Sequence, residues 1–146
     1  MSNRHLFAVS VAMALLLPQT GATLHAQGPL PQDIQRPSIL SDIRTSIIRT
    51  IGAQEATVEI TIKGNVLTVW RSNSNMNQST HAGRDNEAMA IATVVTNAIA
   101  GKPEFNRLVT IWVRYVVRSR PGGPSKNVDS IEFREDPNGV FRFHQT

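Results

Sequence analysis

Val58, Ile60 and Ile62 alternate with polar residues, and after Gly64-Asn65 a second apolar run carries Leu67 and Val69. Alternation with a period of two is typical of a strand with one buried face. A two-residue loop such as Gly64-Asn65 between two alternating stretches predicts a β-hairpin. The loop also sets the register, placing Ile62 opposite Leu67. The hairpin therefore collects its aliphatic side chains on one face.

Two other stretches repeat their apolar residues at helical spacing. The first covers residues 38–52, with Gly52 placed to end a helix, and its apolar stripe is Leu40, Ile43, Ile47 and Ile51. The second covers residues 84–100 and ends before Gly101 and Pro103; its stripe is Ala88, Ile91, Val95 and Ile99. Between the first hairpin and the second helix, the polar residues 72–81 predict a surface loop.

Three more strands are predicted after the second helix. Residues 108–118 form a long alternating stretch, with Val109, Ile111, Val113, Tyr115 and Val117 on one face. Residues 120–127 read as a loop, and alternation resumes at Ile131 and Phe133. Asp136-Pro137-Asn138-Gly139 favours a tight turn into a last strand that carries Phe141 and Phe143.

The resulting succession α-β-β-α-β-β-β predicts an α+β two-layer sandwich. Its simplest packing puts both helices on one face of a five-stranded antiparallel sheet. A right-handed crossover through the second helix, with the third strand beside the first, gives the order 2-1-3-4-5.

The N-terminus has the pattern of a secretory signal peptide. Arg4 and His5 precede an apolar run of about twelve residues, whereas a bilayer-spanning helix needs roughly twenty. Cleavage is expected after Ala26, with Ala22 as the alternative. The prediction is thus an exported protein, periplasmic or secreted, whose mature form has no transmembrane span.

The chain then divides into a signal peptide (1–26), a flexible leader (27–37) rich in proline, and one α+β domain (38–146). It contains no cysteine, so packing alone must stabilise the domain. The net charge of the chain is +4, and the predicted mature form loses only Arg4 from this balance. Such a mildly basic domain suits an acidic partner without requiring one, and export argues against nucleic acid.

No pattern for catalysis, a metal or a cofactor emerges. His144 lacks a second ligand at metal-binding spacing, His81 has only Asp85 four residues on, and the glycines form no phosphate-binding loop. His81 with Asp85 is interpreted as a contact at a helix start. The acidic residues are interpreted as ordinary surface carboxylates: Glu59, Glu87, Glu104, Asp129, Glu132 and Glu135. We expect no enzyme, no metal site and no cofactor.

The hairpin from Ile60 to Val69, followed by Glu87-Ala88 and Ile91-Ala92, resembles the pattern of the BON domain. The resemblance covers about 75 residues and the first five elements, and it would imply an exported phospholipid-binding module. The closing hairpin and the loop at 72–81 depart from that pattern, so the family is not assigned.

Alternation turns two tryptophans and several arginines away from the helices. An indole offers stacking area, and a guanidinium grips carboxylate, phosphate or sulfate. We therefore predict a binding surface for an acidic or amphipathic partner, which could be a protein, a lipid headgroup or a glycan. Its residues are Trp70, Trp112, Arg114, Arg118, Arg134 and Arg142.

Other interpretations stay open at this point. Arg114, Arg134 and Arg142 could instead form cross-strand ion pairs with Glu59 and Glu132, a purely structural arrangement. The protein could be a structural or assembly subunit that forms a homodimer, or docks on another envelope protein, through the same face. A small hydrolase-type enzyme ranks third, because the sequence offers nothing in its favour.

Overall fold

The computed structural model describes residues 31–120 and 123–144, with side chains described from residue 37. The predicted signal peptide 1–26, both cleavage sites and residues 27–30 of the predicted leader lie outside the described residues.

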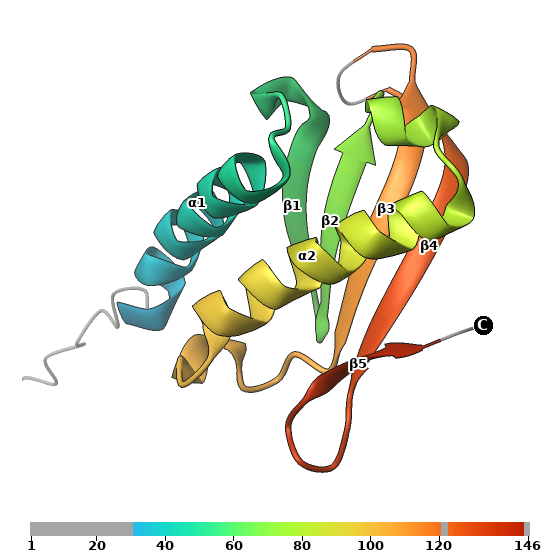
Figure 1. Cartoon of the computed structure of the whole chain (residues 1–146). Coiled ribbons are helices and arrows are strands. Elements are labelled where there is room, and N and C mark those ends of the chain that lie inside the picture. Colours follow the sequence, from blue (N-terminus) through green and yellow to red (C-terminus); the bar gives the residue numbers. More distant parts are fainter. Residues whose placement is uncertain (1–30, 121–122, 145–146) are drawn as a thin grey trace, which may run out of the picture.

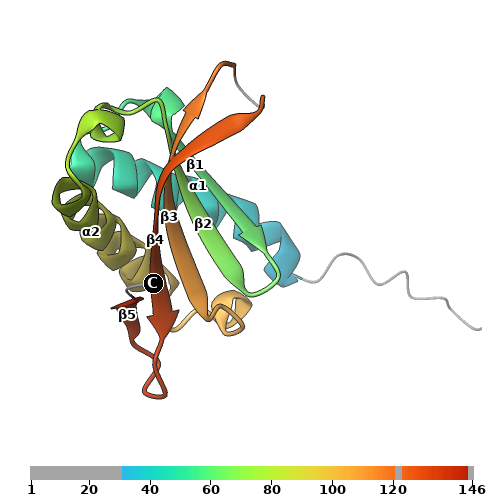
Figure 2. The same cartoon turned by 90° about the vertical axis from the view of Figure 1, so that its right-hand side faces the viewer.

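The described chain is an α+β domain with a five-stranded mixed sheet and two helices (Figure 1). Both helices lie on the same side of the sheet, as two views at right angles show (Figures 1 and 2). The elements follow the predicted succession: α1 (Pro31–Ile51), β1 (Val58–Lys63), β2 (Val66–Ser72), α2 (His81–Ile99), β3 (Thr110–Arg118), β4 (Ser125–Glu135) and β5 (Phe141–His144).

The strand order differs from the prediction. The sheet runs β1-β2-β3-β4-β5; β2 and β3 are parallel, and the other neighbouring pairs are antiparallel. The order 2-1-3-4-5 with all pairs antiparallel is therefore wrong. Helix α1 packs on α2 and on β1, whereas α2 also contacts β3 and β4. Because α1 covers the part of the sheet near β1, α2 lies over the part with β3 and β4. The strand that follows α2 therefore joins β2 rather than β1.

The first hairpin has the predicted register. Ile62 lies opposite Leu67, Ile60 opposite Val69, and the loop residue Gly64 has a φ of +61°. Such a backbone angle is readily adopted by glycine and rarely by other residues. Local turn chemistry and alternation therefore determine this part of the sheet.

Both helices begin earlier than the apolar periodicity indicates. Helix α1 includes residues 31–37, which the sequence analysis expects to be leader, even though Pro37 lies inside it and cannot donate a backbone hydrogen bond. Helix α2 begins at His81, because the side chain of Thr80 accepts a hydrogen bond from the backbone N–H of Gly83 and caps the helix.

Strand β3 departs from simple alternation near its end. The register with β4 shifts between Tyr115 and Val116, so Val116 is buried and Val117 is exposed. Val109, just before the strand, is exposed as well. Val109 and Val117 are therefore not part of the core, although alternation predicts them on the same face as Ile111 and Val113.

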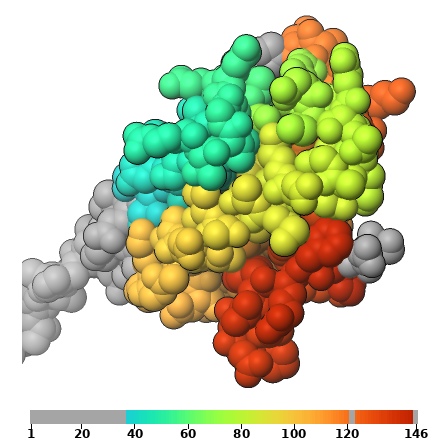
Figure 3. Space-filling view, viewed as in Figure 1, coloured from blue at the N-terminus to red at the C-terminus, as the bar shows by residue number. Residues whose placement is uncertain are grey.

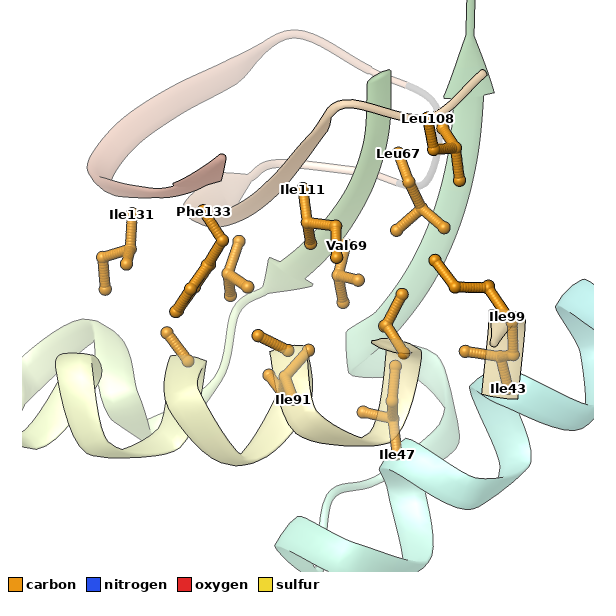
Figure 4. Close-up of a cluster of buried hydrophobic side chains, with 14 of the residues drawn as sticks. Ile43, Ile47, Leu67, Val69, Ile91, Ile99, Leu108, Ile111, Ile131 and Phe133 are labelled. Atoms are coloured by element: carbon orange, nitrogen blue, oxygen red, sulfur yellow. The ribbon is translucent and has the colours of Figure 1, made fainter. Parts of the chain in front are cut away.

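The hydrophobic core lies between the sheet and the helices (Figure 4). From the helix side, α1, α2 and the closing hairpin, which extends beyond the sheet, cover much of the surface (Figure 3). The core residues labelled in Figure 4 are Ile43, Ile47, Leu67, Val69, Ile91, Ile99, Leu108, Ile111, Ile131 and Phe133.

Ile91 tests this packing. It is fully buried on α2 between the helix and the sheet, so Ile91→Ala should lower the free energy of unfolding by about 2–5 kcal/mol. Met89 on the same helix is 54% exposed, and Met89→Ala should change stability by at most about 0.5 kcal/mol. Urea denaturation measures both, and equal effects would contradict the assignment of the buried face of α2.

Candidate functional site

The sheet face turned away from the helices carries both tryptophans of the chain. Trp70 follows the buried Val69 on β2, and Trp112 follows the buried Ile111 on β3, so both indoles point to the opposite side. Both side chains are half-buried. We call this side the open face; the indoles on it are not sealed beneath the helices.

Arginine and tryptophan form a ladder of stacked contacts on the open face. The guanidinium carbon of Arg114 lies 5.1 Å from the ring centroid of Trp112 and 5.5 Å from that of Trp70. The guanidinium carbon of Arg118 lies 5.3 Å from the ring centroid of Trp70. These four residues are the cation–π ladder, and each contact is within the range in which a cation is attracted to an aromatic ring.

The ladder exists because β2 and β3 run parallel. The pairing puts Trp70 beside Arg114 and Thr68 beside Trp112. Arg114 therefore has one indole next to it on the neighbouring strand and another two residues before it on its own strand. The Nε1 of Trp70 also donates a 3.0 Å hydrogen bond to the hydroxyl of Thr61 on β1, which fixes that ring.

Ion pairs engage three of the arginines expected on this face. Arg118 pairs with Glu59, Arg134 with Glu132 on the same strand, and Arg142 with Asp136 in the closing turn, at 2.7, 2.8 and 2.7 Å. Of the cross-strand pairs that the structural interpretation expects for Arg114, Arg134 and Arg142, none is present among the described residues.

The structure brings together Trp70, Trp112, Arg114 and Arg118 of the residues predicted for binding. Arg134 lies on β4 beside Thr110, and Arg142 lies farther out on β5. Among the arginines on the described strands of the open face, Arg114 alone has no carboxylate within ion-pair distance. Its Nε is buried and has no hydrogen-bond partner in the described part of the chain.

A buried ion pair lies on the opposite side, under the helices. Nε of Arg71 donates to Glu87 at 2.8 Å, and their side chains are 3% and 6% exposed. Arg71 also donates to the hydroxyl of Thr57 at 2.7 Å. Glu87 is thus not the surface carboxylate that the sequence analysis expects. The sequence does contain a signal for this pair. Arg71 is two residues after Val69, which places it on the buried face of β2, and Glu87 is four residues before Ile91, which places it on the buried face of α2.

A second polar cluster ties the start of α2 to β4. Asp129 accepts hydrogen bonds from Arg84 and His81, each at 2.7 Å, and Asp85 lies 3.6 Å from His81. The hydrogen bond to Asp129 and its charge raise the pKa of His81 above its usual value. Burial opposes ionisation of Asp129, but the hydrogen bonds from Arg84 and His81 outweigh it and lower the pKa of this carboxyl.

Tyr115 joins the two polar clusters from β3. Its hydroxyl donates a 3.0 Å hydrogen bond to the carbonyl of Arg84. Burial, together with the charge of Glu87, raises the pKa of Tyr115 far above its ordinary value, so the phenol stays protonated and acts as a hydrogen-bond donor between helix and sheet.

In the described ranges, no three His, Cys, Asp or Glu side chains come together as a metal site would require. Neither helix in that part of the chain has the length and apolar content of a membrane span.

No protein-family model matches the chain, and neither a curated protein nor a solved structure matches it. The resemblance to the BON domain therefore has no support from a family match, and the function must be inferred from the site itself.

The ion pair of Arg71 and Glu87 generates a stability prediction. Glu87→Leu and Arg71→Met should each cost about 3–5 kcal/mol, because each leaves an unpaired buried charge. The double variant should regain most of that loss, since it buries no charge. Urea denaturation of the four proteins measures the coupling; additive losses would contradict the pairing.

His81 generates a prediction about pH. Its pKa is raised in the folded protein, so its stabilising contact with Asp129 is complete below the unfolded pKa of about 6.5 and disappears as the pH rises through the higher folded pKa. In an NMR titration of the imidazole proton, Asp129→Asn should lower the midpoint of His81. An unchanged midpoint, with the fold intact by circular dichroism, would contradict the assignment.

Proposed function

We propose that the chain is an exported, non-catalytic binding module that holds an anionic partner on the open face of its sheet. The observation that carries the proposal is Arg114, whose guanidinium contacts the rings of two indoles and lacks a carboxylate partner among the described residues. A positive charge held in place without a counterion favours an anion from outside.

The stacking prepares Arg114 for such a partner. A guanidinium with a ring beside it has fewer conformations to lose when it binds, so less of the interaction energy is spent on ordering. Arginine also keeps its N–H groups in its own plane, where they can reach an anion while the ring contacts are made by its faces. The indoles add apolar area for an amphipathic partner.

The charges of the open face favour an anion over a second copy of the chain. In the middle of the face, the described residues include three arginines and only two carboxylates that pair with them. The arginines are Arg114, Arg118 and Arg134, and the carboxylates are Glu59 and Glu132. Two copies docked face to face would bring like charges together, which costs free energy. A homodimer is therefore the contrary outcome of the binding test.

Binding can be followed through tryptophan fluorescence, because both tryptophans of the chain lie on the open face. We expect saturable changes on titration with one of three anionic probes: poly-L-glutamate, polygalacturonate, or vesicles containing phosphatidylglycerol. Arg114→Gln should weaken binding about tenfold or more, since a hydrogen bond to a charged group contributes about 1.5–3 kcal/mol. Trp112→Ala combined with Arg114→Ala should abolish it.

Arg107→Gln is the matched control, because Arg107 is exposed and lies before β3, away from the ladder. It removes the same charge and should leave binding unchanged. The thermal midpoint of the Arg114 variants should stay within a few degrees of the parent. Binding unaffected by Arg114→Gln, or a doubled mass with both indoles protected from quenchers, would overturn the proposal, the latter in favour of an assembly subunit.

A further inference from the structure

A pocket of about 430 Å³ opens at one end of the open face, where β1 begins and β2 and β3 end. We call it the end pocket. In Figure 1 this is the end toward which the arrow of β2 points. The residues that matter for its chemistry are Thr57, Glu59, Ser72, Asn73, Arg118 and Arg120.

Hydrogen-bond donors in the end pocket are left unused. The hydroxyl of Ser72 and the Nε of Arg118 are both buried, and neither has a hydrogen-bond partner among the described residues. Ser72 itself is only 9% exposed. Buried polar atoms without partners are costly and few in folded proteins, so two of them along one pocket require an explanation.

Arg118 already holds a carboxylate at this place. Its Nη1 donates a 2.7 Å hydrogen bond to Oε2 of Glu59, while its guanidinium lies against Trp70. The two partners differ in exposure: the side chain of Arg118 is 16% exposed, whereas that of Glu59 is 52% exposed. The arginine is thus fixed by packing, and the glutamate can move out into water at little cost, because exposed ion pairs are weak.

We infer that the end pocket binds a carboxylate of the partner, which replaces Glu59 on Arg118. The inference rests on the proposed function, since the pocket lies on the same face and includes Arg118, whose guanidinium lies against Trp70 of the ladder. Glu59 marks the position of the incoming group, and Ser72 and the Nε of Arg118 are the donors that it can recruit by small side-chain movements.

The group already bound to Arg118 favours a carboxylate over a phosphate. The carboxylate of the partner takes the place of the Glu59 carboxylate, so one singly charged planar group is exchanged for another. A phosphate monoester carries about −1.5 to −2 at neutral pH, and the displaced Glu59, which stays nearby on β1, repels it more strongly than it repels a carboxylate.

The test uses purified full-length protein and variants of it that are expected to change the affinity for carboxylates in opposite directions. The probes are poly-L-glutamate and polygalacturonate, which separate a protein carboxylate from a sugar carboxylate, and acetate and inorganic phosphate as small anions. Binding is followed by tryptophan fluorescence. Glu59→Gln should tighten carboxylate binding by up to about fivefold, because the competing ion pair is removed. Arg118→Gln should weaken it about tenfold or more.

The matched control for Glu59→Gln is Glu55→Gln. Glu55 is exposed on the short helical turn before β1, does not line the end pocket, and forms no ion pair among the described residues. It removes the same charge from the same end of the molecule and should leave affinity within about twofold. Arg118→Lys keeps the charge without the planar fork, and it should bind more weakly than the parent while retaining the fold.

The outcomes separate this inference from the proposed function. If Glu59→Gln fails to tighten carboxylate binding, or tightens it no more than Glu55→Gln does, the end pocket is overturned, whatever Arg114→Gln does. Phosphate binding tighter than acetate binding would overturn the carboxylate assignment. If the Glu59 and Arg118 variants behave as expected but Arg114→Gln has no effect, the end pocket stands and the role of the ladder falls.

Discussion

Strands β2 and β3 lie side by side in the same direction, and their register places Trp70 next to Arg114. The contacts of Arg114 with both indoles follow from this pairing. An antiparallel neighbour in its place would set different residues beside Trp70 and would leave Arg114 without its second indole. Helix α2 makes the pairing possible, because it carries the chain back along the helix side before β3 enters the sheet.

Strand β2 also supplies Arg71 of the buried ion pair beneath the helices. Trp70 faces outward and Arg71 faces inward, where it pairs with Glu87 of α2. A buried ion pair gives little net stability compared with an apolar pair of similar volume, but breaking it is costly. It therefore acts mainly as a geometric restraint, which holds the crossover helix at one position above β2, while Asp129, His81 and Arg84 hold the start of that helix to β4.

Local patterns carried most of the fold. The register of the first hairpin could be predicted from Gly64 and the alternation around it, and the closing hairpin from Asp136 to Gly139, because neighbouring residues determine both. The strand order could not be predicted in this way. Whether β3 joins β1 or β2 of the first hairpin depends on how α1 and α2 pack together. The sequence likewise placed Trp112, Arg114 and Arg118 on one face, but the pair of Arg118 with Glu59 joins residues far apart in the chain, and no local pattern indicates it.

The two faces of β2 use charge in different ways, and this difference bears on what the molecule can do. Under the helices, Arg71 and Glu87 are only 3% and 6% exposed, so removing either partner leaves a nearly buried charge unpaired. On the open face, a contact between a half-buried cation and a ring contributes about 0.5–2 kcal/mol, and an ion pair whose carboxylate is as exposed as that of Glu59 contributes about 0–1 kcal/mol. Those contacts are strong enough to orient Arg114 and Arg118 and weak enough to be exchanged for a better anion. A surface whose charges are oriented but incompletely neutralised is suited to reversible binding, and the chain separates that surface from its permanent charge pairs by the thickness of one sheet.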